Sequence, residues 1–458
     1  MRNRYKRLRK QPLFICKIYC EMLDSRGGLD YNSNIICVIM LPRYHDKVMA
    51  GVQKQKQKKQ NGGPMREALL HTPEGVRDIY NSEFAKKERI EHHIKGTMQS
   101  YGFHQLMTPT FEYFDIFNKE RGTVSSKEMY KFVDRDGETL VLRPDMTPQA
   151  ARCVAKYFKQ ETMPIRLFYH GSVFVNYSEH QGKLKESTQL GAELYNEAST
   201  EADAEMAALM IDCLKATGLT KFQVVVGQAD FFRALAEEAQ FSEEETEDLR
   251  NFIEMKNMFA VEQMLSEKEI STELKEIFTK LSTHFGSIET IESMKHMTQN
   301  ERAQESLDRL CTFYKAMCDY GKEEYISFDL GMLSQFNYYT GIIFRAYTHG
   351  TGDVIAAGGR YDGLVSQFGK EAPAIGIAVY SDQIMTALMR QGLLKQPQAD
   401  GILLVYTSVG KQKAFREAIA LREEGKKVTM LVGEDLSEDE IKAYAGRIGV
   451  SEIVLYER

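Results

Sequence analysis

Two stretches decide the fold, Phe168-Tyr169-His170-Gly171-Ser172-Val173-Phe174-Val175 and Gln189-Leu190-Gly191-Ala192-Glu193. Their aromatic and β-branched residues, with a polar loop to Lys185 between them, predict two strands joined by a hairpin. Strand residues four apart point to the same face, so Gln189 and Glu193 share one side of the predicted sheet. Such a pair is usually solvated, but Gly191 between them would leave room for a ligand against the backbone. The pair is therefore either an exposed strand face or part of a binding site.

The hairpin belongs to a longer series of elements within residues 65–395. A helix with Ile90, Ile94 and Met98 on one side precedes it, and another opens at Thr200, where Asp203 completes a predicted capping motif. Residues of about 229–322 have an almost continuous helical pattern. Further strands are predicted at 140–143, 222–226, 325–330, 342–347, 354–357 and 374–379. The pattern predicts an α+β fold with a large antiparallel sheet, flanking helices and a helical insertion.

Residues 396–458 form a separate unit in the sequence. Strands are predicted at 401–406, 427–432 and 452–456, with a helix at 411–424. Ser437 and Glu440 have the spacing of a capping box and predict a second helix. The order strand-helix-strand-helix-strand predicts a small α/β module.

Residues 1–64 differ in composition from the rest of the chain. They carry 14 Lys and Arg but 4 Asp and Glu, and they end in a Lys- and Gln-rich stretch. Three interpretations stay open: a disordered basic tail, a targeting peptide, or translated sequence that is not part of the native protein. We expect Met65 to be the true start.

The charge balance and composition exclude several classes of protein. Residues 65–458 carry 45 basic and 61 acidic side chains, and an acidic body is a poor partner for nucleic acid. The longest apolar run, residues 35–41, is far too short to cross a bilayer, so no membrane span is expected. The seven cysteines form no CxxC pair, which predicts free thiols in a reducing cytosol and no metal site.

Three further motifs carry polar groups at strand ends. Leu140–Thr147 ends a predicted strand with Asp145 and Thr147, a pattern more typical of a helix N-cap than of a binding site. Tyr338-Tyr339-Thr340-Gly341 and Gly358-Gly359-Arg360-Tyr361-Asp362-Gly363 place phenols beside a backbone that allows close approach. Tyrosines on strands more often serve packing than binding.

Together these stretches resemble the catalytic core of class II histidyl-tRNA synthetases over about residues 72–390. The matching segments are Thr72-Pro73-Glu74-Gly75-Val76-Arg77-Asp78, Leu142-Arg143-Pro144, Gln189-x-Gly191-x-Glu193, Tyr338-Tyr339-Thr340-Gly341, Gly358 to Gly363, and Pro373-Ala374-Ile375-Gly376. Several ordered matches in one chain make the resemblance specific. It implies a class II synthetase-like sheet and a dimeric core.

The chain departs from the synthetases where they carry arginines. The resemblance implies arginines that hold the ATP phosphates and the histidine carboxylate, and these fall at Val175, Ser334 and Gln383 in this chain. We therefore expect no adenylation chemistry and no catalytic residue.

The retained residues suit the amino acid itself. Asp145 and Glu193 suit an α-ammonium, and Gln189 and Thr147 add hydrogen bonds. Either a nearby helix N-terminus or Arg360 would have to substitute for the missing carboxylate-binding arginine. The tyrosines at 338, 339 and 361 suit an imidazole.

A synthetase-like chain without these arginines is similar to the regulatory subunits of ATP phosphoribosyltransferase. That resemblance implies a cytoplasmic, non-catalytic subunit that pairs with itself and with a short-form catalytic subunit. It also implies L-histidine as effector, no cofactor or metal on this chain, and a role in the first step of histidine biosynthesis. The alternatives are an active histidyl-tRNA synthetase and an inactive synthetase paralogue with another partner.

Overall fold

The computed structural model describes residues 70–117, 124–178, 182–333, 339–395 and 399–456. The chain divides into two units, Met1–Pro73 and Glu74–Arg458, and the second contains every element discussed below. The expectations for residues 1–64 and for Ser334 and Tyr338 lie outside the described residues.

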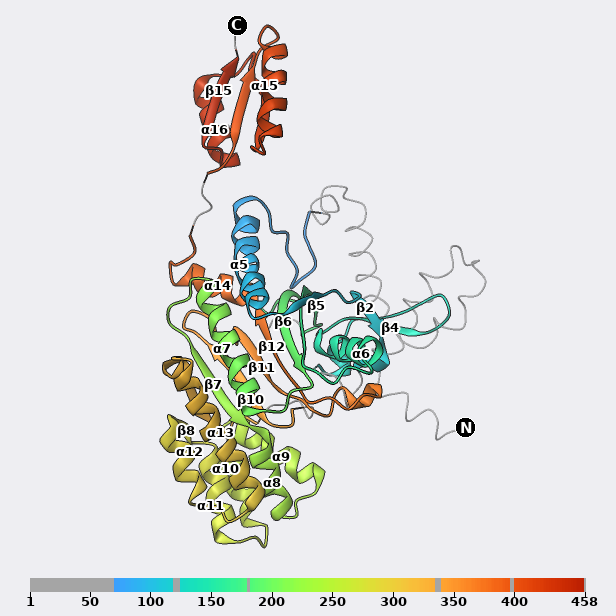
Figure 1. Ribbon diagram of the computed structural model, residues 1–458, viewed down its shortest axis with the longest axis vertical. Coiled ribbons are helices and arrows are strands. Elements are labelled where there is room, and N and C mark those ends of the chain that lie inside the picture. The colour runs from blue at the N-terminus through green and yellow to red at the C-terminus, as the bar shows by residue number, and fades with distance from the viewer. Residues whose placement is uncertain (1–69, 118–123, 179–181, 334–338, 396–398, 457–458) are drawn as a thin grey trace, which may run out of the picture. The chain divides into compact units, whose positions relative to one another are not determined.

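A nine-stranded sheet forms the centre of the second unit (Figure 1). Its strands pair in the order β1-β5-β6-β12-β11-β10-β7-β9-β8. Their bounds are β1 His104–Leu106, β5 Ile165–Phe174, β6 Glu186–Tyr195, β12 Ala374–Tyr380, β11 Ala356–Arg360, β10 Ile342–Tyr347, β7 Gln223–Gln228, β9 Ile326–Asp329 and β8 Phe285–Gly286.

The sheet is mixed rather than wholly antiparallel. The pairs β1/β5 and β7/β9 are parallel, and the other pairs are antiparallel. Parallel neighbours need a long crossover, and the helices between β7 and β9 supply one. The predicted β5–β6 hairpin is confirmed, with Tyr169 opposite Gly191.

Helices cover one face of this sheet. They include α5 (Asn81–Ser100), α7 (Thr200–Ala216) and α14 (Ser381–Arg390) (Figure 1). The predicted apolar side of α5 is confirmed, because Ile90, Ile94 and Met98 are all buried. In β6 the alternate residues Leu190, Ala192 and Leu194 join the same core. Gln189 and Glu193 therefore point to the opposite face, next to α6 (Thr147–Tyr157).

The predicted cap of α7 is wrong. Ser199, not Thr200, is the N-cap, and its hydroxyl accepts from the backbone N–H of Ala202. Asp203 lies fully buried inside the first turn, where its carboxylate accepts from Arg360 and Arg309. Residues distant in sequence therefore use this carboxylate, which a local capping pattern does not reveal.

The insertion is a group of separate helices rather than one continuous helix. They are α8 Ala229–Glu238, α9 Glu243–Glu254, α10 Met258–Ser266, α11 Thr272–Leu281, α12 Ile288–Lys295 and α13 Glu301–Asp319. The short strand β8 lies between α11 and α12 and adds to the sheet edge through β9.

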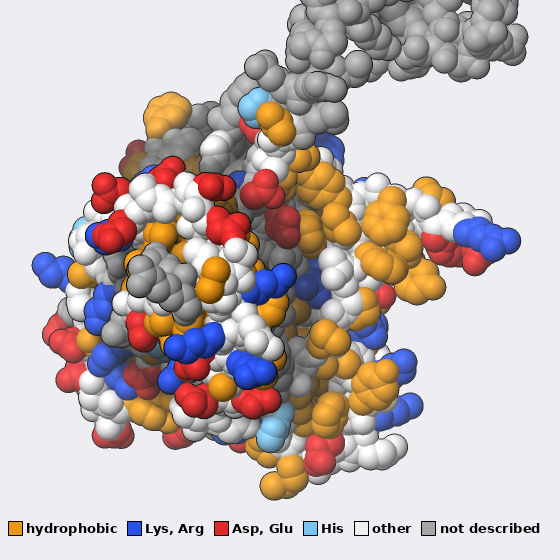
Figure 2. Space-filling model, turned by 90° about the horizontal axis from the view of Figure 1, so that it is seen from above, with side chains coloured by type: hydrophobic (Ala, Val, Ile, Leu, Met, Phe, Trp, Pro, Cys, Tyr) orange, Lys and Arg blue, Asp and Glu red, His pale blue; other side chains and the backbone are white. Residues whose placement is uncertain are grey.

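A second sheet pairs β2 (Phe111–Tyr113), β4 (Thr139–Leu142) and β3 (Lys131–Val133) in the order β2-β4-β3. The predicted 140–143 strand is thus outside the main sheet. One face packs Val141 against Phe117 and Met129. The register places Phe111, Tyr113 and Phe132 on the other face, which is exposed. Hydrophobic side chains gather on this side of the molecule in Figure 2.

The C-terminal module is a three-stranded parallel sheet with a helix on each face. Its strands are β13 (Ile402–Tyr406), β14 (Val428–Val432) and β15 (Glu452–Tyr456), and its helices are α15 (Lys411–Glu423) and α16 (Glu438–Ile448). The predicted capping box of Ser437 and Glu440 is confirmed.

In the described part of the chain, no helix is both long enough and apolar enough to span a membrane. Four cysteines are described, Cys153, Cys213, Cys311 and Cys318, and each is a free thiol.

Candidate functional site

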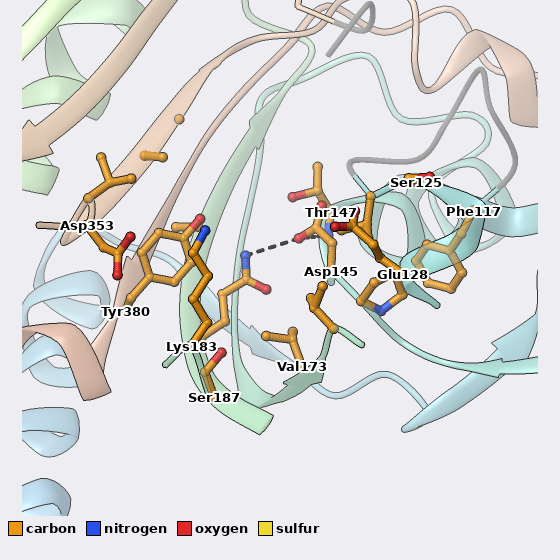
Figure 3. Close-up of a pocket in the computed structure, with 18 of the residues that line it drawn as sticks. Phe117, Ser125, Glu128, Asp145, Thr147, Val173, Lys183, Ser187, Asp353 and Tyr380 are labelled. Atoms are coloured by element: carbon orange, nitrogen blue, oxygen red, sulfur yellow. Dashed lines mark hydrogen bonds between the residues drawn. The ribbon is translucent and has the colours of Figure 1, made fainter. Parts of the chain in front are cut away.

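A cavity of about 1130 Å³ opens on the sheet face that carries Gln189 and Glu193. Its lining comes from β5, β6, β11, β12, the start of α6, the hairpin and α9 of the insertion. Figure 3 shows Asp145, Thr147 and Glu128 on one side of the cavity, and Tyr380 and Asp353 on the other. Residues from widely separated parts of the sequence therefore meet at one site.

Glu193 is the most enclosed carboxylate of the cavity, with 1% of its surface exposed. Thr147 and Tyr169 both donate to its Oε1 at 2.9 Å, and Tyr361 donates to its Oε2. Gly376 lies opposite Glu193 across β12 and β6, and a Cβ at this position would collide with the carboxylate. Burial raises the pKa of Glu193 to about 7, although the three hydroxyl groups oppose that shift.

Gly191 serves a different purpose from the one predicted. A Cβ at this position would lie 2.3 Å from the ring of Tyr169, its cross-strand partner. The missing side chain therefore makes room for a tyrosine of this chain rather than for a ligand. Tyr169 in turn is fully buried and donates to Glu193.

Asp145 and Gln189 form a second polar pair in the cavity. The Nε2 of Gln189 donates to Asp145 Oδ1 at 3.0 Å, and this bond orients the amide (Figure 3). The Oε1 of Gln189 is buried without a hydrogen-bond partner among the described residues. A buried acceptor of this kind favours a ligand that donates an N–H.

Two of the three tyrosines predicted at the site can be placed in the structure. Tyr339 and Tyr361 both line the cavity and are at most 9% exposed. Tyr338 is outside the described residues. The structure thus brings together Asp145, Thr147, Gln189, Glu193, Tyr339 and Tyr361.

Arg360 does not reach the cavity. Its guanidinium donates to Asp203 at 2.6 and 2.8 Å and to the backbone oxygen of Glu197. β11 runs through the Gly-Gly-Arg motif, beyond the predicted end at residue 357, and successive residues of a strand point to opposite faces. Arg360 and Tyr361 therefore point apart, and the predicted role of Arg360 in binding is wrong.

Two of the expected arginine positions line the cavity with uncharged side chains. Val175 is buried, and Gln383 hydrogen-bonds Thr351 at 3.3 Å. Ser334 lies outside the described residues. Cations nevertheless reach the cavity from elsewhere: Arg250 from α9 and Lys183 from the hairpin.

Sequence reasoning missed Tyr169, Tyr380 and Arg250. Strand alternation identifies the two tyrosines, since Tyr169 pairs with Gly191 and Tyr380 with Gln189 on the cavity face. Arg250 had no local signal, because its position depends on how the insertion packs.

Comparisons with known proteins agree with this architecture. A family model described as histidyl-tRNA synthetase matches residues 75–384. A relative in Ruminiclostridium cellulolyticum, named ATP phosphoribosyltransferase regulatory subunit, is 39% identical over 387 residues, which are 84% of this chain and 92% of that protein. A relative of the same name in Acetivibrio thermocellus is 40% identical over 79% of this chain and 86% of its own length. This chain belongs to the ATP phosphoribosyltransferase regulatory subunit family.

Solved structures place this regulatory-subunit family member in the histidyl-tRNA synthetase-like fold. A Bacillus halodurans protein described as an ATP phosphoribosyltransferase regulatory subunit/histidyl-tRNA synthetase has a TM-score of 0.75 and 28% identity, and the match covers 85% of this chain and 98% of that one. A histidyl-tRNA synthetase from Nostoc has a TM-score of 0.71 and 20% identity, over 85% of this chain and 91% of its own, and shares the fold. The predicted class II synthetase-like fold is confirmed.

Proposed function

We propose that this regulatory subunit activates a short-form ATP phosphoribosyltransferase catalytic chain in the cytosol and makes it sensitive to histidine. The reaction condenses ATP with phosphoribosyl pyrophosphate, the first step of histidine biosynthesis. The cavity on the face of β6 is the proposed histidine site, and this chain contributes no catalytic residue. Similarity to relatives named as regulatory subunits supports the assignment of a catalytic subunit as the partner. The polar lining of the cavity supports the assignment of histidine as the effector.

The buried, unpaired Oε1 of Gln189 is the observation that carries the ligand assignment. An α-ammonium donates three N–H groups, and Asp145, which accepts from the Nε2 of the same amide, supplies the opposite charge. Six carboxylates line the cavity against two basic side chains, which favours a ligand with positive charge. The carboxylates are Glu128, Asp145, Glu193, Glu247, Asp353 and Asp382.

Glu193 is better suited to the imidazole than to the ammonium. Its pKa of about 7 is close to the value of about 6.5 of an imidazole, so the two groups share a proton at little cost. The phenols of Tyr361 and Tyr339 line the same cavity. Histidine would thus lie with its ring toward Glu193 and its ammonium toward Asp145 and Gln189.

The test combines the purified chain with its catalytic partner. Activity is assayed with and without histidine, and histidine binding to this chain is measured by calorimetry. Glu193→Gln should weaken both binding and feedback inhibition but retain activation without histidine. Glu186→Gln changes an exposed carboxylate of the same strand that does not line the cavity, and it should behave as wild type.

Unchanged inhibition in a folded Glu193→Gln protein would show that histidine is sensed elsewhere. Failure of the wild-type chain to activate the catalytic subunit would contradict the regulatory role itself.

A further inference from the structure

We propose that Arg250 of the helical insertion binds the carboxylate of the histidine held in the cavity. This inference rests on the proposed function, because it takes histidine as the ligand. The insertion would then be a direct part of the effector site.

The first observation is the position of Arg250. It lies in α9 (Glu243–Glu254), and it is the one arginine among the described residues that line the cavity. Glu247 and Asn251 of the same helix line the cavity beside it. One face of α9 therefore borders the same cavity as β6 and the start of α6.

The second observation is the burial of Arg250. The residue is 8% exposed, so its charge is shielded from water and attracts an anion more strongly than a surface charge would. Its guanidinium also forms an ion pair with Glu247 at 3.1 Å, and that carboxylate is 56% exposed. Arg250 is thus a largely buried cation beside the cavity.

The third observation is chemical. A ligand that presents an ammonium to Asp145 and Gln189 also brings an α-carboxylate into a cavity lined by acidic groups. That carboxylate needs a cation, and the expected arginine positions Val175 and Gln383 are uncharged. A guanidinium has five donors in a planar fork, so Arg250 can hold Glu247 and a ligand carboxylate together.

Lys183 is the competing cation of the described lining. It is exposed and lies over the ring of Tyr177 at 5.0 Å. An exposed lysine is well hydrated and makes single rather than paired contacts with a carboxylate. The observations therefore favour Arg250.

The consequence concerns regulation. Asp145 precedes α6 and Glu193 belongs to β6, whereas Arg250 belongs to the insertion. A histidine bound by all three would connect the insertion to the sheet. Binding would then favour one arrangement of the insertion, as an effector must if it is to shift an equilibrium.

The experiment compares histidine with histamine, which keeps the imidazole and amine but lacks the carboxylate. Both are titrated into the full chain by calorimetry. Wild type should bind histidine more tightly than histamine. Arg250→Met should lose about 10- to 100-fold in histidine affinity, the loss expected for a charged hydrogen-bonded pair, while histamine affinity changes little.

Two further variants make the test specific. Arg302→Met removes a cation from the insertion that does not line the cavity, and it should bind both ligands as wild type does. Arg250→Lys keeps the positive charge but lacks the planar fork of donors. It should weaken the binding of histidine but not that of histamine, and it provides a second test if Arg250→Met does not fold.

Three results would overturn the inference. An Arg250→Met protein with an unchanged preference for histidine would exclude the carboxylate contact. Loss of the preference in Lys183→Met instead would assign the contact to the hairpin. Wild type that binds neither ligand would refute the proposed histidine site and this inference with it.

Discussion

At the scale of single residues, the site depends on what surrounds Glu193. Two strand neighbours lack side chains where space is needed: Gly191 makes room for Tyr169, and Gly376 makes room for the carboxylate itself. Because the carboxylate is buried among hydroxyl groups, its protonation affects the stability of the folded state.

Glu193 should make stability depend on pH. Its pKa rises from 4.5 to about 7 on folding, so the protonated form is favoured in the folded state. The stability this group contributes is complete below about pH 4.5 and is lost as the pH rises to about 7, a change of about 3 kcal/mol. We expect the unfolding free energy of wild type relative to Glu193→Gln to fall over this range. Denaturant titrations at several pH values measure it, and a constant difference would contradict the raised pKa.

At the scale of elements, Asp203 connects three segments of the fold. Its carboxylate joins α7 to Arg360 of β11 and to Arg309 of α13, the last helix of the insertion. Burial raises the pKa of Asp203 although both arginines oppose that shift. The contact fixes the end of β11 directly beside Tyr361 of the cavity.

Asp203→Asn should therefore destabilise the protein strongly. Two guanidinium groups would lose their shared carboxylate, and breaking a buried pair costs about 3–5 kcal/mol.

Ser199→Ala removes the observed cap of α7 and should cost about 1 kcal/mol, whereas Thr200→Ala should cost much less. Urea unfolding measures all three. A larger loss for Thr200→Ala than for Ser199→Ala would contradict the observed cap.

At the scale of the whole molecule, we expect the exposed aromatic face of the β2-β4-β3 sheet to form a dimer contact. The rings of Phe111 and Phe132 lie edge to face, with their centroids 5.9 Å apart. The two residues are 53% and 40% exposed, and Tyr113 lies on the same face of the sheet. Clustered exposed aromatic residues mark interaction surfaces. Phe132→Glu should convert a dimer into a monomer without a large loss of stability, as measured by light scattering. A monomeric wild type, or a dimeric variant, would contradict this prediction.

The chain should also lack synthetase activity. ATP needs several cations around its phosphates, and each charged contact is worth about 1.5–3 kcal/mol. The described lining offers Arg250 and Lys183 against six carboxylates. We expect no histidine-dependent ATP–pyrophosphate exchange by the purified chain, with an active histidyl-tRNA synthetase assayed in parallel as the control. Measurable exchange would support the synthetase alternative.

The sequence by itself determined the features that depend on local periodicity. Alternation along β6 placed Gln189 and Glu193 on one face, the spacing of Ile90, Ile94 and Met98 identified the buried side of α5, and Ser437 with Glu440 marked the start of α16. Each of these patterns spans only a few residues, so it can be recognised in the sequence without knowledge of the tertiary structure.

Only the tertiary structure decided which distant residues meet. It directed Arg360 to Asp203 rather than to the cavity, filled the space at Gly191 with Tyr169, and brought Arg250 of the insertion to the cavity. Each of these contacts joins residues far apart in the chain or on neighbouring strands. These contacts form because buried charges need partners of opposite charge and because side chains fill the available space. Neither requirement produces a periodic pattern in the sequence.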